Sequence, residues 1–253
     1  MSAVTAKAVS WTELGLVPDT VIRAGIRRLL ESKRKEIHSG DAEFAAKAMN
    51  SFVSMMNESP VALVPDLANQ QHYEVPAEFF TQVMGDHLKY SCCYWPDDVS
   101  NLSEAEAAAL EITVKRAGIE DGMAVLDMGC GWGSLSLWIA EHFPNASVTS
   151  VSNSVSQHDF ILRQAADRSI KNIDVIVCDM NDFDIDRKFD RIVSVEMFEH
   201  MRNYGELFRR ISQWLVPDGK FFMHIFCHKS TPYEYIDKGP ADWMSRYFFT
   251  GGI

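Results

Sequence analysis

The pattern of hydrophobic and polar positions along this chain changes near residue 120. Before that point, apolar residues recur at helical spacing, clearly over residues 18–37 and 42–57. After it, short apolar runs alternate with amphipathic segments, and these runs predict five strands at residues 124–128, 147–152, 174–178, 191–195 and 220–227. This alternation of strands and helices predicts an α/β fold with a mostly parallel, doubly wound sheet.

The same pattern predicts how the chain is divided. We expect an N-terminal helical extension over residues 1–70, which starts with a loose leader at residues 1–17, and an α/β domain over residues 71–253. A further helix is predicted over residues 103–116, where Ser103 and Glu106 have the spacing of a capping box. In 253 residues there is room for one sizeable core with a small appended domain.

A glycine-rich turn joins the first predicted strand to the next helix. Residues 129–133 are Gly-Cys-Gly-Trp-Gly, Asp127 precedes them, and Ser134 is the predicted helix cap. Such a turn lets the backbone approach a ligand, and the helix N-terminus offers unpaired N–H groups. The third glycine comes one place too early for the dinucleotide pattern, so the turn fits a nucleotide-like ligand without a pyrophosphate.

Residues 127–133, DMGCGWG, resemble the first motif of S-adenosylmethionine-dependent methyltransferases with a Rossmann-like fold. The resemblance implies that Gly129 and Gly131 pass beneath the methionyl part of this cofactor. It also implies that Asp127 helps to order the ammonium group of the cofactor. The alternative interpretation is an ordinary turn between a strand and a helix.

A second resemblance is more specific. Residues 72–80, HYEVPAEFF, and 89–95, KYSCCYW, resemble the HYD-x-x-x-x-FF and YSCAYW pattern of cyclopropane fatty acid synthases, mycolic acid methyltransferases and coclaurine N-methyltransferases. This resemblance implies that Tyr90 and Ser91 contact the methionyl end of the cofactor and that Cys92 lines the reaction pocket. A turn followed by a short aromatic helix would be the structural alternative for the first piece.

The later strands add further cofactor candidates. A carboxylate usually follows the second strand to bind the ribose hydroxyls, but this chain has Val-Ser-Asn-Ser at residues 151–154. Its resemblance to the family pattern T/S-N-S-x-x-Q makes Asn153 and Gln157 the candidates for the ribose and carboxylate end; an N-cap and a surface glutamine are the alternatives. Asp179 and Met180 are suited to the adenine amino group and ring, unless Asp179 caps the next turn. Val195, at the end of the fourth strand, completes the predicted cofactor site.

The candidate chemistry follows the fourth strand, at residues 196–201, Glu-Met-Phe-Glu-His-Met. If the backbone turns helical there, Glu196 and Glu199 share a face and His200 lies one turn from Glu196. Carboxylates beside a histidine are suited to holding a cationic amine and removing its proton near neutral pH. The structural alternative is an acidic helix start with a packed histidine.

Residues 197–204 resemble the M/L-FEH-M-x-NY signature of the same family. In its alkaloid N-methyltransferase branch, the resemblance implies, Glu196, Glu199 and His200 surround the substrate amine. In the cyclopropane branch the first glutamate is usually a glycine, so Glu196 favours an amine. In the cyclopropane branch, however, the counterparts of Cys92, Glu199 and His224 hold a bicarbonate ion. The alternative for His224 is a core residue, because a lone histidine on an apolar strand is commonly buried in the core.

The charge and cysteine content of the chain restrict the kinds of partner and site that we expect. The net charge of −11 argues against nucleic acid as a general partner. The basic amphipathic helix at residues 18–37 is suited either to an anionic membrane surface or to packing on the main domain. Five cysteines without C-x-x-C or zinc spacing predict neither a disulfide framework nor a metal site. Without a signal peptide or a membrane span in the sequence, the cytoplasm is the expected compartment.

The last residues, 242–253, resemble the family stretch W-x-x-x-Y-F-F-G/P-x-G, after which relatives continue. We therefore expect a fragment that lacks roughly the last quarter to third of a family member. Three functions compete: an N-methyltransferase of a small cyclic or alkaloid-like amine, a synthase that methylates an unsaturated phospholipid acyl chain, and an inactive cofactor-binding fragment. S-adenosylmethionine is the expected cofactor in each, with bicarbonate added in the second, and the oligomeric state is not predicted.

Overall fold

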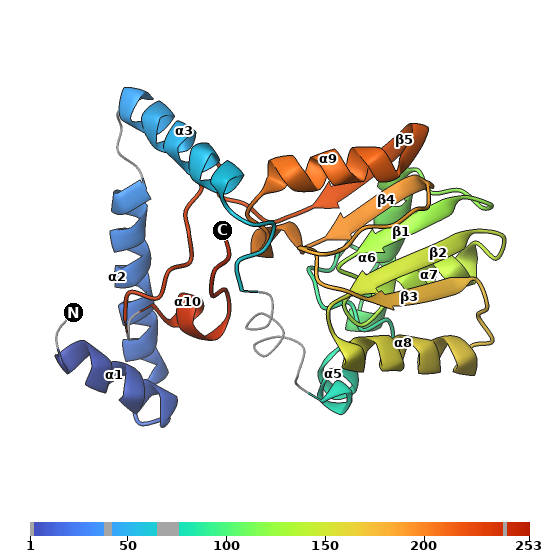
Figure 1. Cartoon of the computed structure of the whole chain (residues 1–253). Helices are drawn as coiled ribbons and strands as arrows, with labels where there is room; N and C mark the ends of the chain where they lie inside the picture. Colours follow the sequence, from blue (N-terminus) through green and yellow to red (C-terminus); the bar gives the residue numbers. More distant parts are fainter. Residues whose placement is uncertain (1–2, 38–41, 65–75, 240–241) are drawn as a thin grey trace. The chain divides into compact units, whose positions relative to one another are not determined.

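The computed structural model describes residues 3–37, 42–64, 76–239 and 242–253. Five of its segments form a parallel sheet of order β3-β2-β1-β4-β5 (Figure 1). The strands are β1 (Ala124–Met128), β2 (Ser147–Ser152), β3 (Ile173–Val177), β4 (Phe189–Val195) and β5 (Leu215–His224). The predicted α/β fold with a doubly wound parallel sheet is confirmed.

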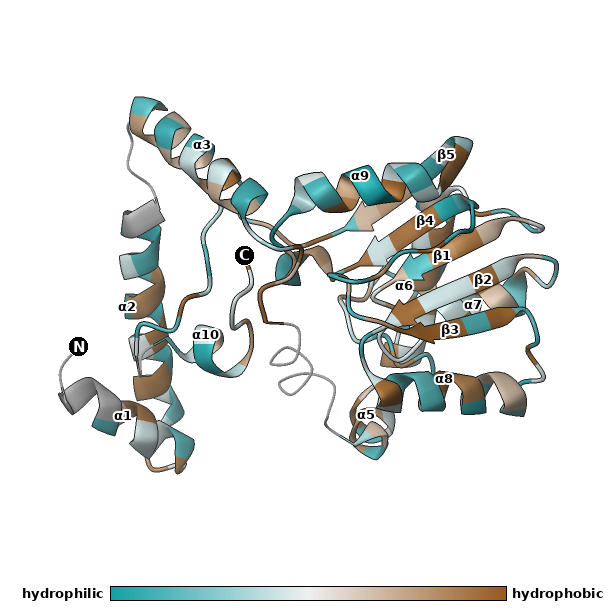
Figure 2. Cartoon of the chain, in the orientation of Figure 1, coloured by the Kyte–Doolittle hydropathy of each residue, from teal (hydrophilic) through white to brown (hydrophobic). Residues whose placement is uncertain are grey.

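Helices cover both faces of this sheet, because successive strand residues point to opposite sides. Val125 belongs to a buried cluster with residues of α6 (Leu102–Ala117) and α7 (Ser134–His142). Its neighbour Leu126 belongs to another cluster with residues of α9 (Tyr204–Trp214). The other α-helices in the described residues 76–239 are α5 (Ala77–Val83) and α8 (Val155–Asp167). Hydrophobic residues run along the strands between these layers (Figure 2).

The chain divides into two compact units, one of Ser59–Phe226 and one of Met1–Glu58 with Cys227–Ile253. The second contains α1 (Ala3–Glu13), α2 (Asp19–Ile37), α3 (Ala42–Glu58) and α10 (Trp243–Tyr247). The expected loose leader at residues 1–17 is therefore wrong, since alanine-rich residues of high helix propensity form α1. The predicted boundary at residues 70 and 71 lies outside the described residues and stays a prediction.

Strand limits follow the prediction in β1 and β2 and depart from it in the other three strands; β4 begins two residues before its predicted start. β1 and β2 have the predicted limits, and β3 begins one residue early. β5 begins at Leu215, five residues before the predicted start, and includes Pro217. Because β5 pairs only with β4 among the described strands, its other side needs no ladder N–H, and an edge strand tolerates proline.

Two predicted helix caps are also wrong. The N-cap of α6 is Asn101, whose side chain accepts from the N–H of Glu104. Glu106 is instead fully buried and binds an earlier turn. The N-cap of α7 is Gly133, at a φ of 80°, and Ser134 is the first helical residue. Glycine is favoured at this position because the backbone there is left-handed, a conformation that residues with side chains rarely adopt.

Candidate active site

Apart from Tyr90, Ser91 and Cys92, the predicted site residues lie at or just after the carboxyl ends of the five strands. The chain leaves β1 toward β2 and later returns to β4 on the other side of β1, so the strand order reverses between β1 and β4. Ligands of open α/β sheets bind at such a switch point. The glycine turn and the segment that contains Glu196 both start there.

The glycine turn needs glycine at two positions for different reasons. A Cβ atom on Gly129, at a φ of 75°, would lie 2.7 Å from Cγ of Met197, a side chain from the segment after β4. A Cβ atom on Gly131, at a φ of 55°, would meet nothing within 4 Å. Gly129 is therefore required for packing, whereas Gly131 leaves open space beside a left-handed backbone that a ligand can approach.

Asp127 is buried at the end of β1. Its Oδ2 accepts a hydrogen bond of 2.6 Å from Oγ of Ser136, on α7, and Ser150 donates to that same hydroxyl. Burial raises the pKa of Asp127 to about 6, although the bond from Ser136 acts in the opposite direction. The hydrogen bond of Asp127 is thus to a serine of the protein itself. Its predicted role in ordering the ammonium group of the cofactor stays a prediction.

Gln157 is also buried, with only 1% of its surface exposed. Its Oε1 accepts from Oγ of Ser152 at 2.6 Å, and its Nε2 has no partner among the described residues. The surface-glutamine alternative is therefore wrong. The N-cap of α8 is Ser154 rather than Asn153, which is half-buried between β2 and that cap.

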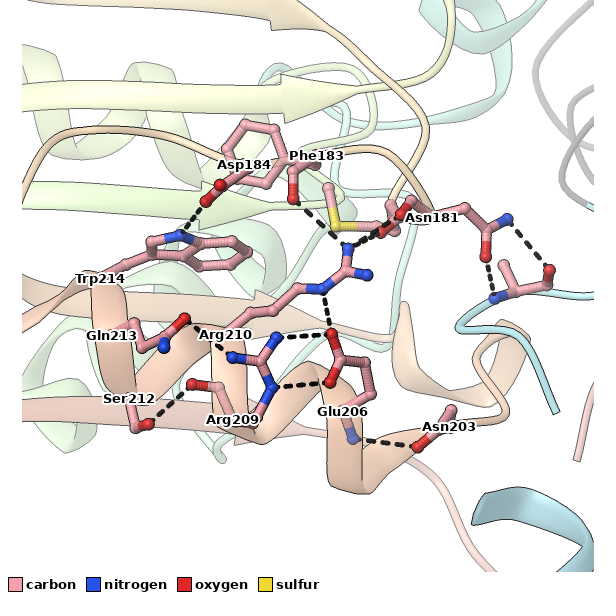
Figure 3. Close-up of polar contacts among 12 residues, drawn as sticks. Asn181, Phe183, Asp184, Asn203, Glu206, Arg209, Arg210, Ser212, Gln213 and Trp214 are labelled. Carbon is pink, nitrogen blue, oxygen red and sulfur yellow. Dashed lines mark hydrogen bonds and ion pairs between the residues drawn. The ribbon is translucent and has the colours of Figure 1, made fainter. Parts of the chain in front are cut away.

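The loop after β3 is held from α9 (Figure 3). Oδ1 of Asp179 accepts from the N–H of Asn181 at 2.7 Å, which is the capping alternative. Nη1 of Arg210 donates to the carbonyl oxygens of Met180 and Asn181 at 3.1 and 2.9 Å, and its Nε donates to Glu206. Sequence reasoning missed Arg210 because Glu206 and Arg210 have the i, i+4 spacing of an ordinary surface pair.

The segment with Tyr90, Ser91 and Cys92 is held by two groups that sequence reasoning also missed. The first is Glu106, whose carboxylate accepts the backbone N–H groups of residues 85, 87 and 89 at 2.9 to 3.3 Å. The second is Lys89, which is buried and donates from Nζ to Oγ of Ser91 and to the carbonyl oxygen of Cys92. Burial lowers the pKa of Lys89. The sequence signal for this role is the position of Lys89 directly before Tyr90, Ser91 and Cys92.

Glu196 does not lie in a helix. Its φ is 52°, in the left-handed region, and a 3₁₀ helix follows at Phe198–His200. The condition for a shared helical face of Glu196 and Glu199, a backbone that turns helical at Glu196, is therefore not met, because one left-handed residue redirects the chain at the end of β4. Oε1 of Glu196 accepts from the N–H of Cys92 at 3.1 Å, which ties the two segments together.

Cys92 and His224 lie together, as the sequence suggested, but the third group beside them is Glu196. Sγ of Cys92 is 3.6 Å from Nε2 of His224, and a carboxylate oxygen of Glu196 lies within 4.8 Å of both atoms. His224 is half-buried at the end of β5 and is not a fully buried core residue. Desolvation is the main cause of the raised pKa of Cys92, and the nearby Glu196 carboxylate contributes.

Glu199 is buried, with 2% of its surface exposed. Its Oε1 accepts from the N–H of Phe226 at 2.8 Å, and its Oε2 has no partner among the described residues. Burial raises the pKa of Glu199 to about 7, and the negative charge of Glu196 adds to the effect. A carboxyl group with this pKa can gain or lose a proton near neutral pH.

The other predicted residues lie on the same segments. Tyr90 is 40% exposed and packs edge-on against Phe80, with ring centroids 5.1 Å apart. Val195 is half-buried and pairs with His224 in the ladder between β4 and β5. His200 is half-buried at the end of the 3₁₀ helix.

Unsatisfied polar atoms are found on the segments that form this edge of the sheet. Four buried side-chain atoms have no hydrogen-bond partner in the described part of the chain: Nε1 of Trp132, Oγ of Ser134, Nε2 of Gln157 and Oε2 of Glu199. They come from segments that follow β1, β2 and β4. Buried groups of this kind are normally paired, so a ligand with charged and hydroxyl groups would complete them.

Comparisons with known proteins agree with this geometry. Residues 65–253 match the family described as mycolic acid cyclopropane synthetase. (S)-Coclaurine N-methyltransferase of Thalictrum flavum subsp. glaucum is 37% identical over 250 residues, which are 99% of this chain and 69% of that relative. Cyclopropane-fatty-acyl-phospholipid synthase of Escherichia coli K12 is 32% identical over 188 residues, 74% of this chain and 46% of that relative.

A solved structure supports the same relationship. The crystal structure of coclaurine N-methyltransferase bound to N-methylheliamine and SAH has a TM-score of 0.93 and 36% identity, covering 99% of this chain and 72% of that one. Mycolic acid cyclopropane synthase CmaA1, solved with SAH and CTAB, has a TM-score of 0.57 at 30% identity and covers 64% of this chain. The chain therefore belongs to the mycolic acid cyclopropane synthetase family of S-adenosylmethionine-dependent methyltransferases.

Proposed function

We propose that this chain transfers a methyl group from S-adenosylmethionine to the nitrogen of a small cyclic or alkaloid-like amine. The observation that carries the proposal is Glu196, whose carboxylate is fixed beside Cys92 in the same site as the buried carboxyl group of Glu199. Two carboxyl groups suit a cationic nitrogen, whereas an uncharged alkene offers nothing for them to bind. The relative solved with N-methylheliamine supports this proposal.

The chain's own residues would hold the cofactor, which supplies a methyl group on a sulfonium centre when bound. Gly131 offers open space beside the backbone of the glycine turn. Gln157 has an unpaired amide donor, with Asn153 nearby in the chain, for the ribose and carboxylate end. Asp179, Met180 and Val195 are proposed for the adenine side, and Tyr90 and Ser91 for the methionyl end. Arg210 and Lys89 hold these segments in place.

The acceptor nitrogen must lose its proton before its lone pair can attack. We assign this step to Oε2 of Glu199, the buried oxygen without a partner among the described residues. Because the pKa of Glu199 is about 7, a large fraction of the group is ionised near neutral pH and can accept the proton. Glu196 and His200 would hold the amine in line with the methyl group, since orientation at near-contact distance is the main requirement of methyl transfer.

A second function is favoured by a separate observation. The pair of Cys92 and His224 resembles part of the bicarbonate site that the cyclopropane branch uses, and the Escherichia coli synthase is a relative. Under this alternative, Cys92, Glu199 and His224 would place bicarbonate and the acceptor would be an unsaturated acyl chain. Oε1 of Glu199 is engaged by the N–H of Phe226, so only its other oxygen would be available. An inactive cofactor-binding fragment is the third alternative.

One product assay separates these alternatives. The protein is incubated with methyl-labelled S-adenosylmethionine and, in separate reactions, with a panel of cyclic amines and with vesicles of unsaturated phospholipid. We expect label in the amine. Label that appears only in lipid would reject the proposal, and binding of SAH without labelling of either acceptor would favour the inactive fragment.

Two further proposals concern contact with a membrane and the location of the protein in the cell. No helix in residues 3–37, 42–64, 76–239 or 242–253 is long and apolar enough to cross a membrane. The apolar residues Val21, Ile26, Leu29 and Leu30 of α2 are at least half exposed, on a helix that also carries six arginine and lysine residues. We propose peripheral contact of α2 with an anionic membrane and a cytoplasmic location. Binding to anionic but not to neutral vesicles would support the contact.

A further inference from the structure

Three side chains that are far apart in the sequence form a cluster of potential metal ligands. Cys92 lies 104 residues from Glu196 and 132 residues from His224 along the chain. The fold brings a thiol, a carboxylate oxygen and an imidazole nitrogen within 4.8 Å of one another. The sequence predicted no metal site because this spacing has none of the short ligand repeats that mark zinc motifs.

The geometry of the cluster resembles that of a zinc site. In a tetrahedral site with Zn–S of about 2.3 Å and Zn–N of about 2.0 Å, the sulfur and nitrogen atoms lie about 3.5 Å apart. The observed separation between Sγ of Cys92 and Nε2 of His224 is 3.6 Å. The spacing of this pair is therefore compatible with one ion bound between the two atoms, and the Glu196 carboxylate, within 4.8 Å of both, is close enough to supply a third ligand.

The ligand types also select the kind of ion. A thiolate and an imidazole favour borderline-soft ions such as Zn²⁺ and Co²⁺, whereas Mg²⁺ and Ca²⁺ prefer oxygen ligands. Cys92 is exposed, and Glu196 and His224 are half-buried, so an ion can reach the cluster from solvent.

We propose that Cys92, Glu196 and His224 together bind one Zn²⁺ ion, with a fourth position open to solvent, and that this ion inhibits the enzyme. The inhibition rests on the function proposed above, in which Glu196 holds the amine. An ion that occupies the Glu196 carboxylate removes it from the amine. Inhibition should therefore compete with the amine and leave the affinity for SAH unchanged, whereas binding of the ion does not depend on the proposed function.

Cobalt titration of the full chain tests the site itself. We expect one equivalent of Co²⁺ to give a sulfur-to-cobalt charge-transfer band together with the visible bands of tetrahedral cobalt. Cys92→Ser should abolish the charge-transfer band, and His224→Gln should weaken binding by at least about tenfold. Cys227→Ser is the matched control, because Cys227 is also exposed and free but lies outside the cluster. An unchanged band in Cys92→Ser would overturn the proposal.

A second measurement needs no variant, so it does not depend on the folding of mutants. The wild-type chain is alkylated with iodoacetamide with and without Zn²⁺, and the modification of each cysteine is followed by peptide mass spectrometry. Zn²⁺ should slow alkylation of Cys92 at least about tenfold. It should change the rate at Cys227 by less than about twofold. Equal protection of the two cysteines, or none at Cys92, would overturn the site.

Kinetics then separate the metal site from the proposed function. Competitive inhibition of amine methylation by Zn²⁺, lost in Cys92→Ser at the same amine concentration, would support both. Zn²⁺ that binds at Cys92 without slowing amine methylation would leave the metal site standing and contradict the placement of the amine at Glu196.

Discussion

Nη1 of Arg210 lies 3.1 Å from the carbonyl oxygen of Met180, so that α9 holds the loop proposed to bind adenine. Arg210→Ala removes these charge-assisted hydrogen bonds, and we expect it to weaken SAH binding about tenfold. Arg209→Ala is the matched control, because Arg209 also pairs with Glu206 but otherwise donates to Gln213 of its own helix. Calorimetric titration with SAH measures both. Equal effects of the two variants would contradict this role.

A more selective readout uses the base itself. Arg210→Ala should reduce the preference for SAH over its inosine analogue, which lacks the adenine amino group, since a displaced loop loses the contact assigned to Asp179. A variant that weakens both ligands equally would show that Arg210 stabilises the fold but does not position the adenine contacts.

The pKa of Glu199, raised to about 7, predicts the pH dependence of activity. As a base, the group acts only when ionised, so kcat at saturating amine should fall about tenfold per pH unit below pH 7. Glu199→Gln should remove this limb of the profile and lower kcat by about 10²-fold or more. The profile is measured with an amine of much higher pKa. Persistence of the limb in Glu199→Gln would assign it to another group.

Asp127 predicts a pH dependence of stability. Its pKa is about 6 in the folded chain against 3.8 for an ordinary aspartate, so folding stabilises its protonated form. That contribution is complete below pH 3.8 and is lost as the pH rises through 6. Relative to Asp127→Asn, the wild type should lose about 2 kcal/mol in free energy of unfolding between pH 4 and pH 7. Urea denaturation measures this difference, and parallel pH curves for the two proteins would contradict it.

Glu106 predicts a large effect of a small substitution. Its fully buried carboxylate accepts three backbone N–H groups of residues 85–89. Glutamine keeps only one acceptor oxygen and turns an NH₂ group toward these donors. We therefore expect Glu106→Gln to lower the free energy of unfolding by about 2 to 4 kcal/mol. Glu104→Gln, at an exposed cap of the same helix, should change it far less, because water can replace its partners. Similar losses in urea denaturation would contradict the account.

The sheet centre could be predicted from the sequence because its signals are local. β1 and β2 are short, largely buried segments bounded by turn residues, so both of their limits were found. The Ser103 and Glu106 pair also has a local signature, but tertiary structure overrides it: Glu106 serves a turn some twenty residues earlier. Local spacing does not show which distant backbone will compete for a carboxylate.

The site was predicted less completely for the same reason. Helical spacing placed Glu199 beside Glu196, but the left-handed backbone of Glu196 turns its carboxylate to Cys92. Lys89 and Arg210 act through main-chain carbonyls, and such contacts leave no pattern in a sequence. Family resemblance identified the segments of the site, while the structure showed which side chains meet.

The central claim is that Glu196 selects the amine acceptor, and Glu196→Gly tests it. Glycine suits a φ of 52°, so this variant should fold. Asp218→Gly is the matched control, since Asp218 has a φ of 65° and lies exposed on β5.

The decisive measurement is the rate of amine methylation by both variants, beside their affinity for SAH. The account predicts that Glu196→Gly loses at least about 10²-fold in amine methylation while SAH affinity stays within about twofold, and that Asp218→Gly matches the wild type. Amine methylation that survives in Glu196→Gly, or that falls in step with SAH affinity, would contradict it.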